Sequence, residues 1–432
     1  MESFQTLDRG RCHVHVMAHP AFRTREVSLR FHLRMSRDRV TEVAMLPSVW
    51  LNGTRKLPSY RQIALATDDL YGTYVRSAIG KRGGYHILEI GANVPDVPGE
   101  ENGPLLDRAL DLALSLAFDH ALGMGGFAPQ AVEREKELHR RRIRAALDDK
   151  AAYALQRCHQ IACQGTPAGL PRLGFQEDVD ALLPDRLHDV YRQVLDEAEV
   201  HAYVVGPSRD TAGLADRVAE KLAAWLPHAR TGHRSATVSD VVAAPATRAF
   251  EEITEQQDAN QTQFDLAFAS GIHLADPKYP ALVMMNGVFG GFAHSKLFMH
   301  IRERKSLAYS VWSFVDAATG LLTVYAGISA DKREEVRDIL GAELEAIRRG
   351  EISPDEWQET RASLRNQYQQ MMDQPAMLIA WHHHAVLAGS NLTLADMVEK
   401  VGEVRPEDAA EVALALRPVC LYVLEGRGGG GA

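Results

Sequence analysis

The sequence predicts an α+β protein of two duplicated domains, each with a mixed, mainly antiparallel sheet and helices packed on one face. Three observations lead to this class. Segments with alternating apolar residues, typical of strands, are interleaved with longer segments whose apolar residues recur at helical spacing. The same order of segments then recurs in the second half of the chain. At 432 residues the chain is also long for one hydrophobic core, which favours more than one domain.

The first half begins with strands and short helices. CHVHVMA and EVSLRFHL alternate within 11–34 and predict two strands, joined by a turn that contains Pro20. We then expect a helix over 43–51, a helix from Pro58 to about Leu70, and strands over 73–80 and 85–94. A loop rich in proline and glycine follows at 95–99.

Helices dominate the remainder of the first half. Leucine and alanine recur at helical spacing over 104–122. Pro129 is well placed in a first helical turn, and we expect the helix that it begins to run through Ala151. Three further elements close this half: a helix that begins at Pro184, a buried strand over 201–206 and a helix over 210–226.

The second half matches the first segment by segment. QFDLAFASGI resembles EVSLRFHLRM, SLAYSVWS aligns with LYGTYVRS, and LLTVYAGIS aligns with HILEIGANV. Each half also ends with a helix begun by proline, followed by a strand ending in glycine, HAYVVG or CLYVLEG. Because a period above roughly 200 residues is too long for a solenoid, these matches predict two copies of one domain.

The repeat divides the chain into four parts. We expect an N-terminal domain over 1–226, a linker over 227–249, a C-terminal domain over 250–426 and a flexible tail over 427–432. The linker is rich in proline, alanine, serine and threonine and has no sustained period. The tail, RGGGGA, carries nothing that could hold it in a fold.

Composition excludes several classes of protein. The formal net charge is −9 and the basic runs lie beside acidic ones, which gives no footprint for nucleic acid. No run approaches the roughly 18 apolar residues of a membrane span, and the N-terminus lacks the apolar core of a secretory signal. The four cysteines are scattered without a CxxC pair, as in reduced proteins. We expect a cytoplasmic protein with neither nucleic acid nor membrane as a partner.

The stretch Gly290–Val311, GGFAHSKLFMHIRERKSLAYSV, concentrates the chemistry of the chain. Its two glycines permit close backbone approach or positive φ, and a short amphipathic helix should follow them. From Leu307 the period changes to two, which predicts a strand with Leu307, Tyr309 and Val311 on one face. Arg302 and Tyr309 then flank one helix-to-strand corner.

The pattern GGxxxSxLFxxIRExxxLAYSV, in a duplicated α+β fold, resembles the pitrilysin or insulinase family of inverzincin metallopeptidases. The resemblance covers nearly the whole chain. Within the family, it is a resemblance to the short-chain group that includes the subunits of mitochondrial processing peptidase, among them the non-catalytic subunit. The segments TDDLYGTYV and AMLPSVWLNGT are similar to those of a zinc-less bacterial group, the YfmF-like proteins.

The resemblance also implies that the zinc site is lost. Active members carry HFLEHMLFKGT, and aligning its GT with Gly53 and Thr54 places the two zinc-ligand histidines at Ala44 and Ser48. The glutamate base then falls at Pro47. In a later helix, EREKELHRRRI places Arg142 where the family has its glutamate ligand. Alanine cannot bind zinc, proline cannot accept a proton, and arginine brings positive charge to a dication site. We therefore expect neither a catalytic residue nor a bound metal in this chain.

The resemblance gives Arg302 and Tyr309 a different role. In the family an arginine and a tyrosine at this spacing are thought to hold the substrate backbone opposite the zinc. A guanidinium offers rigid donors to carbonyl or carboxylate oxygens, and a phenol can donate or accept. The alternative interpretation is that Arg302 caps a helix and Tyr309 belongs to the core.

Several histidines are candidate metal ligands. His13, His15 and His19 form HxHxxxH, and His13 and His15 would point the same way on a strand, as in some metal sites, but we favour a solvent-facing strand edge. The run His382–His384 is expected on a helix, where neighbouring positions diverge by about 100° and cannot all reach one ion. His300 belongs to HxxER, an inverted-zincin motif without its final histidine.

Three functions follow as hypotheses. The first is a catalytically inactive subunit that binds and orients a peptide for a zinc-bearing homologous subunit in a heterodimer. The second is a non-proteolytic binding or scaffold protein that forms a homodimer and keeps only the fold. The third, an independent metallopeptidase, predicts stoichiometric zinc in the isolated protein. Whether this chain is itself part of an enzyme depends on the partner, which alone should carry zinc.

Overall fold

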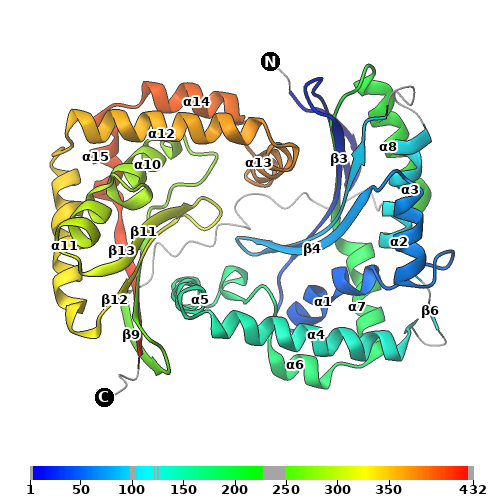
Figure 1. Ribbon diagram of the computed structural model, residues 1–432, viewed down its shortest axis with the longest axis horizontal. Coiled ribbons are helices and arrows are strands. Elements are labelled where there is room, and N and C mark those ends of the chain that lie inside the picture. The colour runs from blue at the N-terminus through cyan, green and yellow to red at the C-terminus, as the bar shows by residue number, and fades with distance from the viewer. Residues whose placement is uncertain (1–2, 98–103, 121, 124–125, 227–248, 427–432) are drawn as a thin grey trace. The chain divides into compact units, whose positions relative to one another are not determined.

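Two large sheets with the same strand order form the framework of the protein (Figure 1). The structure, a computed structural model, describes residues 3–97, 104–120, 122–123, 126–226 and 249–426. The described residues fall into two compact units. One lies within Met1–Arg144, Leu170–Ala236 and Pro375–Ile379, and the other within Ala145–Gly169, Thr237–Gln374 and Ala380–Ala432.

The first unit contains a sheet of six strands, in which only β2 and β8 run parallel to each other. In spatial order the strands are β1 (Gln5–Arg9), β2 (Cys12–Ala18), β8 (Glu199–Gly206), β3 (Thr24–Arg34), β5 (Tyr85–Pro95) and β4 (Tyr74–Arg82). The short pair β6 (Leu122–Gly123) and β7 (Gly126–Phe127) lies apart from this sheet.

One face of this sheet is apolar and packs against helices. Leu29 and Phe31 on β3 and Leu88 on β5 share one buried cluster with Trp50 of α1, because alternate residues of a strand point to the same side. The helices are α1 (Val40–Trp50), α2 (Tyr60–Asp68), α3 (Pro104–Phe118), α4 (Pro129–Asp148), α6 (Gln176–Ala181), α7 (Pro184–Glu197) and α8 (Thr211–Trp225).

The second unit contains a sheet of five strands, in which only β13 and β9 are parallel. The order is β11 (Ala308–Asp316), β12 (Leu321–Ile328), β10 (Thr262–Ala269), β13 (Arg417–Gly426) and β9 (Glu251–Gln257). Its helices include α10 (Tyr279–Asn286), α11 (Arg333–Arg348), α12 (Pro354–Met372), α14 (Leu394–Glu403) and α15 (Pro406–Ala415), and α13 (Pro375–Leu387) belongs to it from Ala380 onward. The two π-helices, η3 (Gly287–Gly291) and η4 (Phe298–Arg304), precede β11.

The two sheets confirm the duplication. Reading outward from the parallel pair, the first unit has the order β2-β8-β3-β5-β4 and the second has β9-β13-β10-β12-β11. The strands that the sequence matches paired, such as β3 with β10 and β5 with β12, therefore occupy equivalent places. Both sheets are mixed and mainly antiparallel, so the α+β class is confirmed as well.

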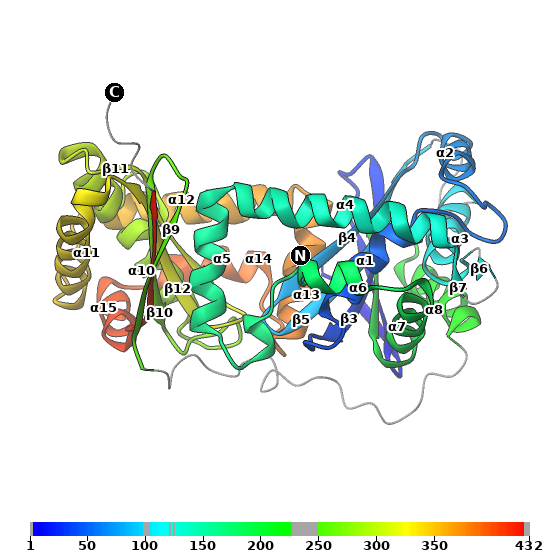
Figure 2. The same ribbon diagram turned by 90° about the horizontal axis from the view of Figure 1, so that it is seen from below.

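One helix departs from the expected arrangement. The helix expected through Ala151 ends at Asp148, because the Asp149 side chain caps a new helix, α5 (Lys150–Ala162), by accepting a bond from Ala152 N at 3.1 Å. Cys158 of α5 is buried together with Ala267 of β10 and Cys420 of β13. In both views α5 lies on the opposite side of the second sheet from α11 and α15 (Figure 1 and Figure 2).

The domain boundaries expected from the sequence can be compared with the structure only in part. The domain ranges 1–226 and 250–426 stay predictions, and the compact units differ from them by grouping Ala145–Gly169 with the second sheet. The expected tail at 427–432, and the linker at 227–249 except for its last residue, lie outside the described residues. Within the described ranges, no helix is both long enough and apolar enough to cross a bilayer.

Candidate functional site

The residues that the resemblance assigns to a lost zinc site lie where α1 meets α4. Ala44 and Pro47 are buried in α1, and Ser48 is half-buried on the same helix. Arg142 lies on α4, and its Nη1 donates a hydrogen bond to Ser48 Oγ at 2.7 Å. The structure thus brings together two residues, 94 apart in the sequence, that the alignment placed in one pocket.

This corner offers a poor set of metal ligands. The Ala44 methyl group has no lone pair, and Pro47, inside α1, has neither an N–H nor a side-chain acceptor. The Arg142 guanidinium carries a positive charge to the Ser48 hydroxyl, where a dication would have to compete with it. That these are the family's zinc positions stays a prediction, because it depends on the register of the alignment.

Two residues that the sequence motifs did not single out, Asn52 and Glu135, hold this corner together. Asn52 Nδ2 donates to Ser48 O and to Glu135 Oε1, each at 3.2 Å, and Arg134 Nη2 donates to Asn52 Oδ1. Glu135 is only 6% exposed, so its carboxylate depends on these partners. Asn52 lies in LNGT and Glu135 in EREK, two segments that align this chain with the family motifs. In that alignment they only fix the register and are given no role of their own.

The second candidate site is the corner between η4 and β11. The helix is a π-helix over Phe298–Arg304, a form that often occurs at functional sites. Ser306 follows with φ of 51°, a left-handed conformation that reverses the chain, and Leu307 N donates to Ile301 O at 2.9 Å. The Arg302 side chain is 44% exposed, and its Cζ lies 4.7 Å from the centroid of the Phe298 ring.

Tyr309 lies in a β-bulge at the start of β11. Ala308 pairs with Ile328 and Ser310 pairs with Gly327, so Tyr309 is the extra residue between two successive pairs. It is 67% exposed, which makes the core interpretation of Tyr309 wrong. The expectation that it shares a face with Leu307 and Val311, both buried, is wrong for the same reason, because the bulge interrupts the period of two.

The two glycines that begin this stretch allow close packing rather than positive φ. A Cβ on Gly290 would lie 2.6 Å from Ser313 Oγ, and one on Gly291 would lie 2.9 Å from Asn286 Nδ2. Ser313 Oγ donates to Asn286 Oδ1 at 2.7 Å, which fixes β11 against α10. Close approach, one of the two expected uses of these glycines, is confirmed.

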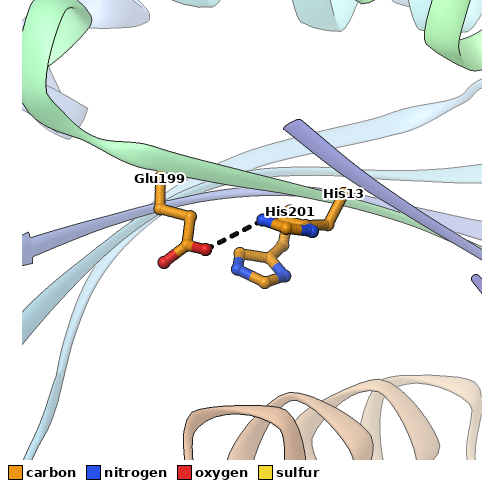
Figure 3. Close-up of side chains that lie close together, drawn as sticks. All are labelled: His13, Glu199 and His201. Atoms are coloured by element: carbon orange, nitrogen blue, oxygen red, sulfur yellow. Dashed lines mark hydrogen bonds and ion pairs between the residues drawn. The ribbon is translucent and has the colours of Figure 1, made fainter. Parts of the chain in front are cut away.

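A third cluster lies on the first sheet, formed by His13, Glu199 and His201 (Figure 3). The expected solvent-facing strand edge is wrong, because β2 lies between β1 and β8 and His15 is 1% exposed. His13 bonds Glu199 Oε1 through Nε2 at 2.8 Å and Asp8 Oδ1 through Nδ1 at 2.6 Å. Burial lowers the pKa of His13, but these two carboxylates outweigh burial and raise it.

The other histidines considered as ligands, His300 and the run His382–His384, lie in structural rather than metal-binding environments. His300 Nδ1 bonds Glu343, and Arg304 Nη1 bonds His300 Nε2 at 2.6 Å, so His300 and Arg304 of the HxxER motif belong to a local hydrogen-bond network. His382, His383 and His384 lie on α13 as expected. Burial lowers the pKa of His382 to about 4. Among the residues that the structure describes, only His13, Glu199 and His201 place three potential ligand atoms within 4.8 Å of one another.

Sequence comparisons place the chain among proteins related to metallopeptidases. A family model described as "Peptidase M16 inactive domain" matches residues 182–364. The probable inactive metalloprotease YmfF of Bacillus subtilis (strain 168) is 28% identical over 423 residues, which cover 97% of each chain. The resemblance stated from the sequence motifs is thereby confirmed at the level of the family.

Structural comparisons agree over the whole length. A conserved protein from Enterococcus faecalis V583 matches with a TM-score of 0.88 and 26% identity, covering 98% of this chain and 99% of that chain. The peptidase M16 inactive domain from Pseudomonas fluorescens matches with a TM-score of 0.78 and 15% identity, covering 98% of each chain. At that identity the second likeness shows the fold alone.

Proposed function

This chain is an inactive homologue of the M16 metallopeptidases, and from that premise we propose that it binds and orients a peptide for a zinc-bearing homologous subunit. The partner supplies the zinc and the general base, and the two subunits form a heterodimeric peptidase. The chain described here supplies substrate contacts only. Its compartment in this proposal is the cytoplasm, in keeping with four cysteines that are all free thiols.

The observation that carries the proposal is the exposure of Arg302 and Tyr309 at one rigid corner. The guanidinium is held over the Phe298 ring and is accessible to a ligand. It can donate to a peptide carbonyl or to a terminal carboxylate, and each charge-assisted bond contributes about 1.5–3 kcal/mol. The Tyr309 hydroxyl, raised out of the strand by the bulge, can add one more bond to the same peptide backbone.

Such contacts can raise a rate without any chemistry at this chain. Holding a peptide bond in line with an attacking water reduces the entropy that must be lost at the transition state. Positioning of this kind contributes several kcal/mol to lowering a barrier. The corner at Ser48 and Arg142 takes no part in the reaction in this scheme.

The test is a reconstitution with the homologous zinc-bearing peptidase, assayed on a panel of unstructured peptides. We expect the wild-type chain to raise kcat/KM of the mixture. Arg302→Ala should lower the stimulated kcat/KM by about tenfold to a hundredfold, as expected for one charge-assisted bond. Arg302→Lys should recover only part of the loss, because an ammonium lacks the planar fork of donors.

The matched control is Lys305→Ala, which removes another exposed cation three residues away, one paired with Glu335 at 3.0 Å. This variant should stimulate like the wild type. Equal peptidase activity with and without the chain, or equal stimulation by Arg302→Ala and wild type, would refute the proposal. A stable homodimer that ignores the zinc-bearing homologue would favour the scaffold function instead.

A further inference from the structure

The cluster on the first sheet joins residues from two parallel strands. His13 on β2 is the register partner of His201 on β8, and Glu199 lies two residues before His201, so all three side chains leave the same face. The alternate residues of these strands, such as Val14 and Val200, belong to the apolar core on the other face. The cluster is therefore built on rigid strands and not on a loop.

The three side chains converge from neighbouring positions. His13 Nε2 lies 2.8 Å from Glu199 Oε1, and the rings of His13 and His201 are stacked with centroids 4.6 Å apart. One ligand atom from each of the three residues lies within 4.8 Å of the other two. The close-up shows the Glu199 carboxylate and the two imidazoles gathered on one side of the strands (Figure 3).

We propose that His13, Glu199 and His201 bind one divalent transition-metal ion of the zinc type. Zinc takes imidazole nitrogen and carboxylate oxygen at about 2.0–2.2 Å, and a tetrahedral site then separates its ligand atoms by roughly 3.3 Å. Small side-chain rotations bring the present spacing to that value. The ion replaces the proton on His13 Nε2, which is released to solvent. Two nitrogens and one oxygen favour zinc and its neighbours over magnesium or calcium, which take oxygen ligands.

Residues that hydrogen-bond to the two proposed histidine ligands can orient them for metal binding. Asp8 Oδ1 lies 2.6 Å from His13 Nδ1, an arrangement in which a carboxylate orients a metal-binding imidazole. His15 Nε2 lies 3.0 Å from His201 Nδ1, which assigns Nε2 of His201 to the ion. Thr6 Oγ1 in turn bonds His15 Nδ1 at 2.9 Å. Both proposed histidine ligands are thus fixed by a second hydrogen bond.

This site is separate from the positions of the family's zinc motif. Those positions lie on α1 and α4, whereas the proposed ligands lie on β2 and β8. The proposal does not depend on any peptidase role, because the two sites share no residue. A metal here would tie β2 to β8, the only parallel pair in the first sheet.

The experiment is calorimetric titration of the chelator-treated full chain with ZnCl2. We expect one zinc per chain in the wild type, and at least hundredfold weaker binding in His13→Gln and in His201→Gln. Asp8→Asn, which changes only the outer shell, should weaken binding by about tenfold to a hundredfold. Thermal unfolding of each variant without metal shows whether it is folded.

Control variants and a spectroscopic measurement distinguish the proposed site from zinc binding by other residues of the chain. Arg142→Ala, on α4, and His188→Gln, on α7, change residues outside the proposed site and should bind zinc like the wild type. X-ray absorption of the zinc-loaded wild type should show only nitrogen and oxygen neighbours, since a cysteine site would add sulfur at about 2.3 Å. Absence of binding at micromolar zinc, a sulfur neighbour, or unchanged affinity in folded His13→Gln and His201→Gln would overturn the proposal.

Discussion

Tyr309 owes its exposure to one extra residue in β11. Without the bulge, its side chain would point with the buried Leu307 and Val311, as strict alternation predicts. The bulge turns the phenol outward while its neighbours stay packed. Arg302 is fixed differently, by stacking on Phe298 within a π-helix. Two backbone irregularities thus present two polar side chains at one corner.

The close packing at Gly290 gives a prediction about stability. In Gly290→Ala the new methyl group would lie 2.6 Å from Ser313 Oγ and 3.0 Å from Ser313 Cβ. The variant should therefore lose about 1–3 kcal/mol of unfolding free energy. Urea denaturation measures the loss. Gly341→Ala is the matched control, because it lies in α11 with no atom within 4 Å and should be neutral or stabilising by up to about 1 kcal/mol. Equal stabilities of the two variants would contradict this account.

At the scale of elements, α5 shows how the first half of the sequence contributes to the second sheet. Its residues Cys158 and Ala154 belong to the apolar cluster on that sheet. Its C-terminal turn is joined to the end of β11 by His159 Nε2 and Asp316 Oδ2, 3.2 Å apart. Asp316 is held further by Thr319 Oγ1, which donates at 2.8 Å.

This ion pair predicts a pH-dependent stability. Burial alone would lower the pKa of His159, but bonds with Asp316 and Cys163 and the charge of Asp316 outweigh burial and raise it to about 9. Because the unfolded value is about 6.5, the stabilisation is complete below about pH 6.5 and is lost as the pH rises through about 9. His159→Gln should therefore cost about 2–3 kcal/mol at acidic pH and little at about pH 10.

The measurement is the difference in urea-unfolding free energy between wild type and His159→Gln across that range. Titrating groups that do not contact His159 are common to both proteins and cancel in the difference. A difference that does not change between about pH 6 and pH 10 would show that the pair contributes no charge-dependent stability.

Sequence patterns predicted the elements that follow a simple period. The strands β3, β5, β10 and β12, and the helices begun by proline at Pro129, Pro184 and Pro406, lie close to where they were expected. The edge strands β1 and β9 were missed, because QTLDR and EEITEQQ are polar and expose alternate or most residues. Such strands are specified by their neighbours' backbone groups, which a local pattern does not contain.

The candidate sites were predicted unevenly for the same reason. Arg302 and Tyr309 could be selected from their motif, but the bulge that exposes Tyr309 depends on how β11 pairs with β12. The histidine cluster joins His13 with His201, and only the parallel pairing of β2 and β8 brings them together. The signals were HVH and HAYVVG, which read separately as ordinary strands.

At the scale of the whole molecule, the two units share one strand topology but carry different side chains on it. The second unit has the exposed side chains of Arg302 and Tyr309 near the start of β11. The strand equivalent to β11 in the first unit is β4. The first unit instead carries the α1–α4 corner closed by Arg142 and Ser48. In the proposed function, the substrate contacts and the hydrolytic chemistry are divided between this chain and a partner.

The most direct test of that division is whether a peptide touches the corner during turnover. A photo-crosslinking residue, p-benzoylphenylalanine, is introduced in place of Tyr309, and in a second protein in place of Tyr60, a tyrosine of α2 with the same 67% exposure. Each is mixed with the zinc-bearing homologue and a labelled peptide, then irradiated. We predict capture of the peptide at position 309, competed by unlabelled substrate, and none at position 60. Equal capture at both positions, or none at 309 while the peptide is being hydrolysed, would contradict the account.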